Sequence, residues 1–460
     1  MAGNRTSAGR RRLPWPVWAL AAGCTGVYLA ASLTLCRLYL AGMDLALYGE
    51  AVRGYAHGGL PWSHIKAQVP FDLLGDHFTP IMALLGPVYR LWPDVRVLLI
   101  AQAVLFGVAV LGVGAMASAR LRPRQALLVQ ACFGLSWGVL NATVFAFHEI
   151  AFAVPLLVWA VWAVWETPRW GQYALACVLL VATKEDSTLM TAGLGLMLIA
   201  RGRVRAGLIT GAASVAVFVA LIGWVIPSLN AQGTYTYLAG KGVGASLSIL
   251  AGPDFWLFLL TLAVTLGLGW RSPLAWALLP AVAARLVGGQ AQAFRFGYHY
   301  NATLMVICFL AVVDAWSRAP LTPRWRTRTD LAQAVALVLV AAMGVVSSVV
   351  AVDLRMPSSI TGRAQALDRA VAMVPDGAPV IADEFVLAHL VDDHPVSIAN
   401  IAWTDSLGAP LARSGWIILD TASYSWDDID TGWESRQAAS LEGEGCAVML
   451  EESSILVLEC

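Results

Sequence analysis

Long apolar runs separated by short loops dominate this sequence of 460 residues. Several runs reach about 20 residues, the length that an α-helix needs to cross a hydrocarbon core of roughly 30 Å. Hydrophobic residues make up 58% of the chain and charged residues 13%, whereas soluble domains are roughly 45–50% apolar. The sequence therefore predicts an α-helical polytopic membrane protein with about eleven transmembrane helices, near residues 14–40, 96–118, 126–146, 149–166, 171–184, 187–200, 206–227, 253–269, 272–289, 301–317 and 330–352.

Arginines indicate the orientation of these spans, because Lys and Arg are enriched in cytoplasmic loops. The first run is longer than that of a secretory signal, so we expect a retained span with its N-terminus in the cytoplasm. Every second loop after it is basic, and an odd number of spans then places the C-terminus on the extracytoplasmic face of the plasma membrane. The N-terminus and the loops that are predicted to be cytoplasmic contain Arg5, Arg10, Arg11, Arg12, Arg120, Arg122, Arg124, Arg169, Arg201, Arg203, Arg205, Arg271, Arg318, Arg324, Arg326 and Arg328.

Two runs, 171–184 and 187–200, are each shorter than a full span. A single long span could replace them, but it would bury the "TKEDS" segment, Thr183 to Ser187, in the middle of the membrane. Each charge there costs roughly 2.5–3.5 kcal/mol on insertion scales, and this segment carries three charges. We therefore predict two short helices that meet near the outer face.

The C-terminal part differs in charge from the rest. Residues 353–460 contain 18 acidic and 5 basic residues, a net charge of −13. The segment "RAQALDRAVAMV" has helical spacing, "APVIA" and "GWIILD" are typical of strands, and "CAVMLEESSILVLEC" is typical of a closing hairpin. We expect a transmembrane domain over 1–352, with an extracytoplasmic first loop at 41–95, and a small extracytoplasmic α/β domain over 353–460 that serves for docking rather than chemistry.

The seven cysteines are scattered and show no Cys-x-x-Cys or His-paired spacing. Their pattern therefore indicates neither a zinc site nor a disulfide framework.

Titratable residues gather at the predicted outer ends of the spans. Asp and Glu hardly affect orientation, so the positive-inside rule does not explain them. Ionisable groups at membrane depth need partners or a substrate, which makes this face the candidate functional site. We expect five of them to line one cavity there: Asp44, His77, His148, Lys184 and His299.

Each cluster also has a purely structural explanation. Asp44 and Asp76 could cap the helices near them, and His148 with Glu149 could be an exposed loop. The "TKEDS" segment could be an internally paired surface turn. The aromatic residues of "FRFGYHYNA" could be interface anchors. It is the occurrence of all five clusters on one face that favours function.

These motifs also carry a resemblance that covers nearly the whole chain. "D-L-x-L-Y" from Asp44, "DHFTPIMALLGPVYRLWP", "FHEIAFAVPLL", the Lys-Glu-Asp hairpin and "GYHYNA" resemble the domain of unknown function 2079 family of predicted bacterial membrane proteins. That family more distantly resembles the GT-C superfamily of membrane glycosyltransferases. The resemblance implies a GT-C-like fold, a polyprenyl-phosphate sugar as donor, catalysis on the outer face and an essential acid in the first outer loop.

The resemblance implies that the essential acid is Asp44 and that Glu50 is the neighbouring acid, although the usual adjacent Asp-Glu pair is absent. It also implies that Lys184 contacts the donor phosphate. Such a transfer needs a base for the acceptor hydroxyl and cations for the leaving phosphate. No His-x-x-x-His or Glu-x-x-His spacing indicates a preformed metal site, so a divalent metal stays open. The predicted catalytic residues are Asp44, Glu50, His77, His148 and Glu149, and the predicted substrate-binding residues are Asp76, Lys184, Glu185, Asp186, Arg295, His299 and Tyr300.

The leading hypothesis is a glycosyltransferase-like protein that moves a sugar from a polyprenyl phosphate to a cell-envelope glycan, lipid or protein. Its partners are then the lipid bilayer, the donor and the acceptor, with no role for nucleic acid. A transporter or flippase of polyprenyl-linked substrates is the main alternative, although transporters place polar groups near the midplane and often have repeated halves. A non-catalytic envelope scaffold is the third, and it leaves the clustered His and Lys unexplained.

Overall fold

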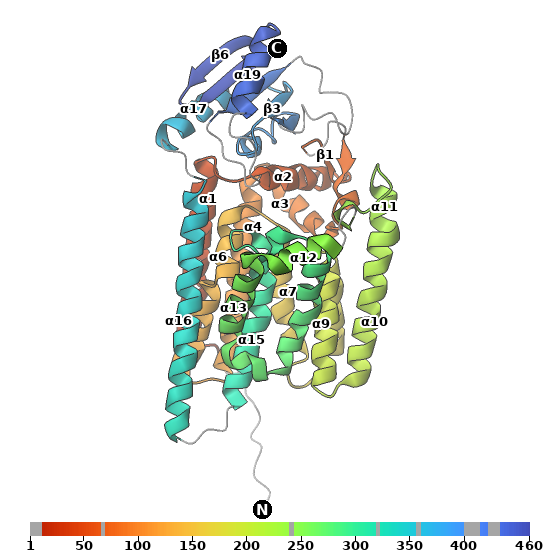
Figure 1. Ribbon diagram of the computed structural model, residues 1–460, viewed down its shortest axis with the longest axis vertical. Coiled ribbons are helices and arrows are strands. Elements are labelled where there is room, and N and C mark those ends of the chain that lie inside the picture. The colour runs from red at the N-terminus through yellow and green to blue at the C-terminus, as the bar shows by residue number, and fades with distance from the viewer. Residues whose placement is uncertain are drawn as a thin grey trace, which may run out of the picture.

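The computed structural model describes residues 12–65, 70–238, 243–318, 323–355, 360–399, 415–421 and 433–460. Arg5, Arg10 and Arg11 lie outside the described residues. The helices form an elongated bundle, and a small sheet region at the C-terminus covers one end of it (Figure 1).

All eleven predicted runs contain helices. Among the described residues, seven helical segments are long and apolar enough to cross a membrane, and four of the predicted runs correspond to shorter apolar helices, so the number of spans stays a prediction. The bundle consists of α1 (Trp15–Arg37), α4 (Arg96–Ser118), α5 (Pro123–Gly134), α6 (Trp137–Phe145), α7 (Ile150–Ala163), α8 (Trp170–Val181), α9 (Ser187–Ala200), α10 (Val204–Ala220), α11 (Ile226–Leu229), α12 (Val243–Ala251), α13 (Pro253–Leu266), α14 (Leu279–Val287), α15 (Ala302–Arg318) and α16 (Pro323–Asp353).

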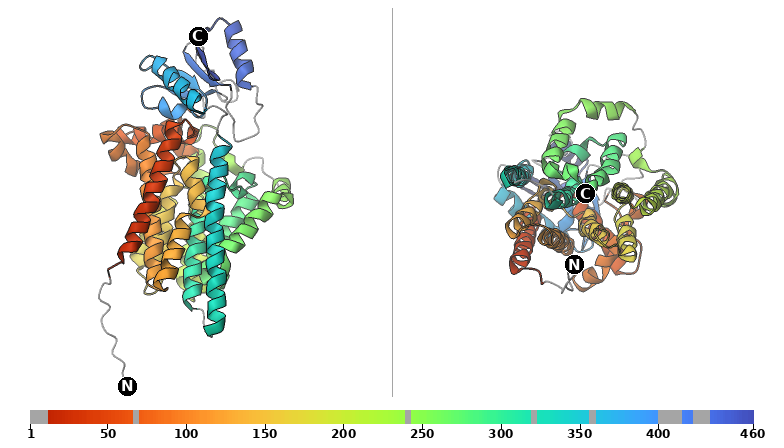
Figure 2. Two further views of the ribbon diagram at one scale, coloured as in Figure 1. Left: turned by 90° about the vertical axis from the view of Figure 1, so that its left-hand side faces the viewer. Right: turned by 90° about the horizontal axis from the view of Figure 1, so that it is seen from below.

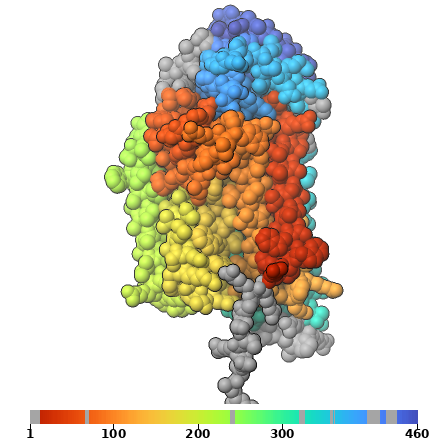
Figure 3. Space-filling view, turned by 180° about the vertical axis from the view of Figure 1, so that it is seen from behind, coloured from red at the N-terminus to blue at the C-terminus, as the bar shows by residue number. Residues whose placement is uncertain are grey.

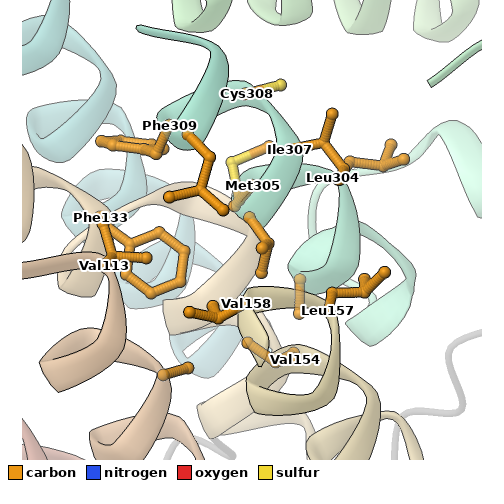
Figure 4. Close-up of a cluster of buried hydrophobic side chains, with 14 of the residues drawn as sticks. Val113, Phe133, Val154, Leu157, Val158, Leu304, Met305, Ile307, Cys308 and Phe309 are labelled. Carbon is orange, nitrogen blue, oxygen red and sulfur yellow. The ribbon is translucent and has the colours of Figure 1, made fainter. Parts of the chain in front are cut away.

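The most buried of these helices is α15. In its most apolar window 89% of the residues are buried, compared with 17% for the segment that contains α10. Figure 4 shows Leu304, Met305 and Phe309 of α15 among side chains of α4, α5 and α7. Helix α10 lies at the periphery of the bundle (Figure 2). Because α15 contacts protein on all sides, its sequence is apolar all round, whereas the exposed apolar side of α10 fits contact with lipid.

The segment after α8 has the predicted form of two helices joined by a turn. Helix α8 ends at Val181 and α9 begins at Ser187. The turn between them contacts the first loop, because Ile81 donates its backbone N–H to the carbonyl of Ala182 at 3.0 Å. The charges of "TKEDS" therefore lie at a helix end rather than within a helix.

The first long loop, between α1 and α4, is folded rather than extended. It contains α2 (Met43–Ala56), a two-residue pairing of β1 (Trp62–Ser63) with β2 (Phe71–Asp72), the 3-10 helix η2 (Pro80–Leu85) and α3 (Gly86–Leu91). Helix α2 begins after Gly42, so Asp44 stands in its first turn and is not its N-cap. Thr79 precedes η2, so Asp76 does not cap that helix either. Capping therefore does not account for these two acids.

The C-terminal sheet region has five strands in the order β4-β3-β5-β7-β6. Strands β3 (Val380–Ala382), β4 (Val396–Ile398) and β5 (Trp416–Asp420) are parallel, and β7 (Ile455–Glu459) pairs antiparallel with both β5 and β6 (Ala447–Glu452). Helix α17 (Ile360–Met373) precedes the sheet, and α19 (Trp433–Gly443) precedes the hairpin. The predicted helix, strands and hairpin are all present.

The expectation about cysteines is wrong for this hairpin. Cys446 and Cys460 form a disulfide, with their Cα atoms 4.3 Å apart. The register of the hairpin explains it: Ala447 pairs with Glu459, which brings the residues just outside this pair face to face. Spacing rules for metal sites missed the pair because the two cysteines meet through strand pairing and not through a short motif.

The sheet region and the first loop share one hydrophobic core. Leu45, Ala51 and Val52 of α2 belong to the same buried cluster as Val380, Leu390 and Val457 of the sheet region. Gly49 permits this close packing, because a Cβ there would lie 2.7 Å from Val95 Cγ1 and 3.5 Å from Val391 Cγ1. The space-filling view shows the loop between the helices and the sheet region (Figure 3). We call this assembly, made of the described residues within 41–95 and 360–460, the roof.

Candidate active site

Three polar groups meet where the roof lies on the bundle. In the first group Asp44 contacts His148, which in turn stacks on His299 from a different part of the chain. Asp44 Oδ2 lies 3.3 Å from His148 Nε2, and the His148 ring stacks on His299 with ring centroids 3.5 Å apart. The backbone N–H of His148 donates to Gln102 Oε1 at 3.1 Å. The Nδ1 atoms of both histidines are buried and have no hydrogen-bond partner among the described residues, so the pair retains free polar positions.

The second group is a buried ion pair. Tyr48, one helical turn after Asp44 on the same face of α2, donates its hydroxyl to Glu149. Lys184 Nζ lies 3.2 Å from Glu149 Oε1. The carboxylate of Glu149 therefore has both a cation and a hydroxyl donor as partners at a buried position, where an unpaired charge would be costly.

The third group ties the "GDHFTP" loop to the "TKEDS" turn. His77 Nδ1 lies 2.8 Å from Glu185 Oε1, and the backbone N–H of Phe78 donates to Glu185 Oε2 at 3.0 Å. Tyr235 donates to the same carboxylate at 2.9 Å. Burial works against ionisation of Glu185, but His77 and Lys184 lower its pKa to about 2.

Asp76 belongs to the same wall of the site. It accepts a hydrogen bond of 2.9 Å from the hydroxyl of Tyr237, whose ring stacks on His77 at 4.3 Å. Asp76 and His77 are thus both held by Tyr237, which comes from the segment between α11 and α12.

The three groups are linked into one network through residues that are adjacent in the chain. His148 of the first group precedes Glu149 of the second, and Lys184 of the second precedes Glu185 of the third. All five residues that were expected to line one cavity belong to this network: Asp44, His77, His148, Lys184 and His299.

Of the other predicted site residues, Glu50 and Arg295 have partners outside this network, Asp186 is exposed, and Tyr300 touches the network through His299. Glu50 accepts the backbone N–H of His64 at 2.9 Å and lies 3.9 Å from Arg53, so its contacts are within the first loop. Arg295 pairs with Asp254 at 3.3 Å, and both are about half exposed. Asp186 is exposed at the start of α9, and the Tyr300 ring lies 4.2 Å from that of His299.

Sequence reasoning left four contributors out of the site. Tyr48 lies in the "D-L-x-L-Y" motif, and its spacing of four from Asp44 signals a shared helix face. Tyr235 and Tyr237 alternate in "GTYTYL", a loop with no acid or histidine to draw attention to it. Gln102 is a polar residue in an otherwise apolar run, and it also donates to the backbone carbonyls of Ala142 and Ala146 at 3.3 and 3.0 Å. It therefore fixes the turn that presents His148.

Within the described residues, no group of three or more His, Cys, Asp or Glu side chains is placed to hold a metal ion. The acids of the network are directed at partners of their own: Asp44 at His148, Glu149 at Lys184, and Glu185 at His77. The side chains that could ligate a metal are therefore paired with neighbouring residues and do not converge on one point.

The arrangement can still bind and polarise an anionic substrate. The side chains of Lys184 and His77 are 15% and 14% exposed, so both can reach a ligand at the network's surface. The side chain of Asp44 is 24% exposed and is oriented by His148. A carboxylate beside fixed cations is what a general base and a phosphate clamp require.

Comparisons with known proteins agree with this picture of the fold. The sequence model of the family described as "Predicted membrane protein (DUF2079)" matches residues 34–444. Among solved structures, the crystal structure of ArnT from Cupriavidus metallidurans bound to undecaprenyl phosphate matches with a TM-score of 0.50 and 14% sequence identity, over 95% of this chain and 98% of that chain. A search of curated proteins found no significant match. At this identity the likeness to ArnT shows a shared fold.

Proposed function

Because the chain belongs to the DUF2079 family of predicted membrane proteins, in agreement with the resemblance seen in its motifs, we propose that it is a GT-C-like membrane glycosyltransferase. It transfers a sugar from a polyprenyl-phosphate donor to a glycan, lipid or protein of the cell envelope. Two findings support the proposal: the polar network at the roof, and a shared fold with a protein that was crystallised with undecaprenyl phosphate.

The observation that carries the proposal is the contact between Asp44 and His148, next to the ion pair of Glu149 with Lys184. Placing charged side chains from several chain segments at the membrane boundary costs free energy of desolvation. A purely structural role does not need charged side chains at this position, so their presence favours a function. The same groups suit transfer from a lipid phosphate.

In the proposed reaction the acceptor hydroxyl oxygen forms a bond with the anomeric carbon of the sugar while the bond from that carbon to the phosphate oxygen breaks. Asp44 takes the hydroxyl proton, since it is the partly exposed carboxylate of the network, and His148 orients it. The leaving polyprenyl phosphate retains the bonding electrons, and Lys184 and His77 stabilise its negative charge. Glu149 and Tyr48 hold Lys184 in place.

The test is a transfer assay with purified protein in liposomes and a panel of polyprenyl-phosphate sugars. Asp44→Asn keeps the shape and removes the base, so turnover should fall about 10²- to 10⁴-fold. Asp376→Asn makes the same chemical change at an exposed turn of the sheet region and should leave turnover unchanged. His77→Ala should also abolish transfer while the protein stays folded.

If Asp44→Asn and His77→Ala both kept normal turnover with a donor that the wild-type protein uses, the enzyme proposal would be wrong. Transport of polyprenyl-linked substrates across the same liposomes would then be the function to measure.

The proposal also requires the roof to lie on the extracytoplasmic face of the plasma membrane, with the N-terminus in the cytoplasm. The connection between α9 and α10, where Arg201, Arg203 and Arg205 occur, lies at the end of the bundle away from the roof (Figure 1), which supports this orientation. Protease added to cells without their outer layers should cleave the sheet region. Protection until the cells are lysed would reverse the orientation.

A further inference from the structure

A groove lies between α4 and α7 at the end of the bundle that is remote from the roof. The start of α4 contacts the sheet region through Val95 and Asp392, so its last turns lie at the opposite end. The groove has a volume of about 500 Å³. Gly112, Ala115 and Ala119 of α4 form one wall, and Trp159 and Trp162 of α7 form the other. It is separate from the polar network described above.

The sequence explains why the helices leave space here. Residues 112, 115 and 119 share one face of α4, and all three have small side chains. At Gly112 the helices approach closely, because a Cβ there would lie 2.7 Å from Val158 Cγ1. Val158 itself packs in the bundle core (Figure 4). Beyond this contact, small residues of α4 face the large rings of α7 across the groove.

The dimensions of the groove match one leaflet of a membrane. Its lining runs along α4 from Val108 to Ala119, which is about 16 Å at 1.5 Å per residue. Half of a hydrocarbon core of roughly 30 Å is a similar length. The side chains of Val108 and Trp162 are 51% and 39% exposed, so the groove opens toward the lipid. An acyl chain fits such a groove in length and in polarity.

Cations stand at the mouth of the groove. The guanidinium of Arg169 lies 4.3 Å from the Trp162 ring, and that of Arg120 lies 4.4 Å from the Trp165 ring. One acid, Glu166, is also present, but its side chain is 77% exposed and it is paired with Arg120 at 2.8 Å. Arg169 is exposed, and the mouth therefore carries an excess positive charge.

Two more arginines hold the basic loop in position. Arg201 and Arg203 donate to the backbone carbonyls of Trp165 and Glu166, at 2.8 and 2.6 Å, and so hold the loop that follows α7. Arg201 Nη1 is buried and has no hydrogen-bond partner within the described part of the chain. These side chains position the basic loop next to the aromatic wall.

We propose that this groove binds an anionic glycerophospholipid of the leaflet at the basic end of the bundle. One acyl chain lies between the small residues of α4 and the tryptophans of α7, and the headgroup phosphate lies at Arg120 and Arg169. Basic pockets between transmembrane helices on the cytoplasmic side are typical sites for anionic headgroups. The site is distinct from the proposed donor site, which lies at the other end of the bundle.

The experiment uses the full chain in nanodiscs of phosphatidylcholine. Phosphatidylglycerol with a photoreactive group in its acyl chain is added, and the matched phosphatidylcholine probe is used in parallel. Mass spectrometry should locate the phosphatidylglycerol cross-links within residues 108–120 and 155–169, well above those of the phosphatidylcholine probe. Equal labelling by the two probes would overturn the proposal.

Variants test the two halves of the site. Arg169→Gln should weaken retention of phosphatidylglycerol about fivefold, since one surface cation contributes about 1 kcal/mol. Ala115→Trp should fill the groove and abolish the cross-links. Arg205→Gln, an exposed arginine at the same end but outside the groove, should change nothing. The proposal would be contradicted if labelling were unchanged in both Arg169→Gln and Ala115→Trp. It would also be contradicted if added polyprenyl phosphate competed with the probe more strongly than unlabelled phosphatidylglycerol does. None of these readouts depends on sugar transfer.

Discussion

The bundle and the roof have hydrophobic cores of different origin, and the roof core also takes in Val97 of α4 and Phe152 of α7 from the adjoining ends of the bundle helices. The bundle core contains Phe106, Phe133, Trp137 and Phe309, which come from long helices. The roof core joins side chains that are more than 300 residues apart in the chain, such as Leu45 of α2 and Val380 of β3. The first core follows from apolar helices packing against each other, whereas the second exists only when the two distant segments meet.

The polar network lies along the boundary between these two cores. Asp44, Tyr48 and His77 come from the roof, whereas Lys184 and Glu185 come from the turn between two bundle helices. The candidate site is therefore completed by docking: the bundle supplies Lys184, and the roof supplies the carboxylate of Asp44 and the imidazole of His77.

The largest effect is expected from Lys184→Met, on the bundle side. The substitution removes the cation but keeps most of the volume, and it leaves Glu149 buried without its ion-pair partner. Breaking a buried pair in this way costs about 3–5 kcal/mol. Thermal unfolding in detergent should show a large drop in the midpoint.

A second variant separates lost charge pairing from lost packing. The double variant Lys184→Met with Glu149→Gln removes both charges, so it should be more stable than Lys184→Met alone. If the double variant were as unstable as the single one, the loss would come from packing and not from the uncompensated carboxylate.

The sequence predicted the bundle well because its signal is local. Runs of apolar residues bounded by arginine form helices whatever they pack against. The hairpin that ends at Cys460 was also predicted from local sequence alone. The docking of α2 on the sheet region could not be predicted in this way. Leu45 and Val380 have no feature in one sequence that marks them as partners, and neither do Cys446 and Cys460 until the strand register is known.

Predictability was uneven within the site too. Charged residues that the chain places near apolar runs, such as His148 and Lys184, stand out because their burial needs a reason. Glu50 stood out equally, but the helical rotation between positions 44 and 50 directs it toward His64 and Arg53 instead. Tyr235 was missed because a tyrosine in a loop carries no signal until its hydroxyl is seen at Glu185.

Acid should weaken the boundary between roof and bundle. The pKa of Glu185 is about 2 in the folded protein, below its ordinary value of 4.5, so its stabilising contribution is present above pH 4.5 and is lost as the pH falls toward 2. A depression of about two units corresponds to roughly 3 kcal/mol. Unfolding midpoints measured from pH 6 to pH 3 should fall in the wild-type protein.

Glu185→Gln is the control for this titration. The variant should be less stable at pH 6 and should show a smaller loss between pH 6 and pH 3, because the titrating group is absent. An identical pH profile in both proteins would assign the acid sensitivity to other carboxylates.

On the roof side, removal of the disulfide should loosen the sheet region and spare the bundle. The double variant Cys446→Ser with Cys460→Ser opens a loop of about 15 residues, for which the chain-entropy model gives about 3 kcal/mol. Proteolysis should cut the hairpin earlier, while the helical circular dichroism of the bundle melts as before. Simultaneous melting of both regions would show that the two cores form one cooperative unit.

The smallest effect is expected at one hydrogen bond of the roof. Tyr89 donates its hydroxyl to Asp392, which also accepts the backbone N–H of Val95 at 3.1 Å. Tyr89→Phe keeps the buried ring and removes this bond to a carboxylate, which costs about 1.5–3 kcal/mol when the acceptor is charged. Because Val95 still binds Asp392, we expect the lower end of this range, seen as faster hydrogen exchange around Asp392.

Tyr173→Phe provides the matched change in the bundle, where the tyrosine hydroxyl donates to Thr210 at 3.3 Å. It should leave exchange in the sheet region unaltered, since Tyr173 belongs to the bundle core. The pair of variants therefore measures how far a local loss spreads across the boundary. If Tyr173→Phe also accelerated exchange around Asp392, the two cores would be coupled through the polar network, and the network would transmit strain as well as bind substrate.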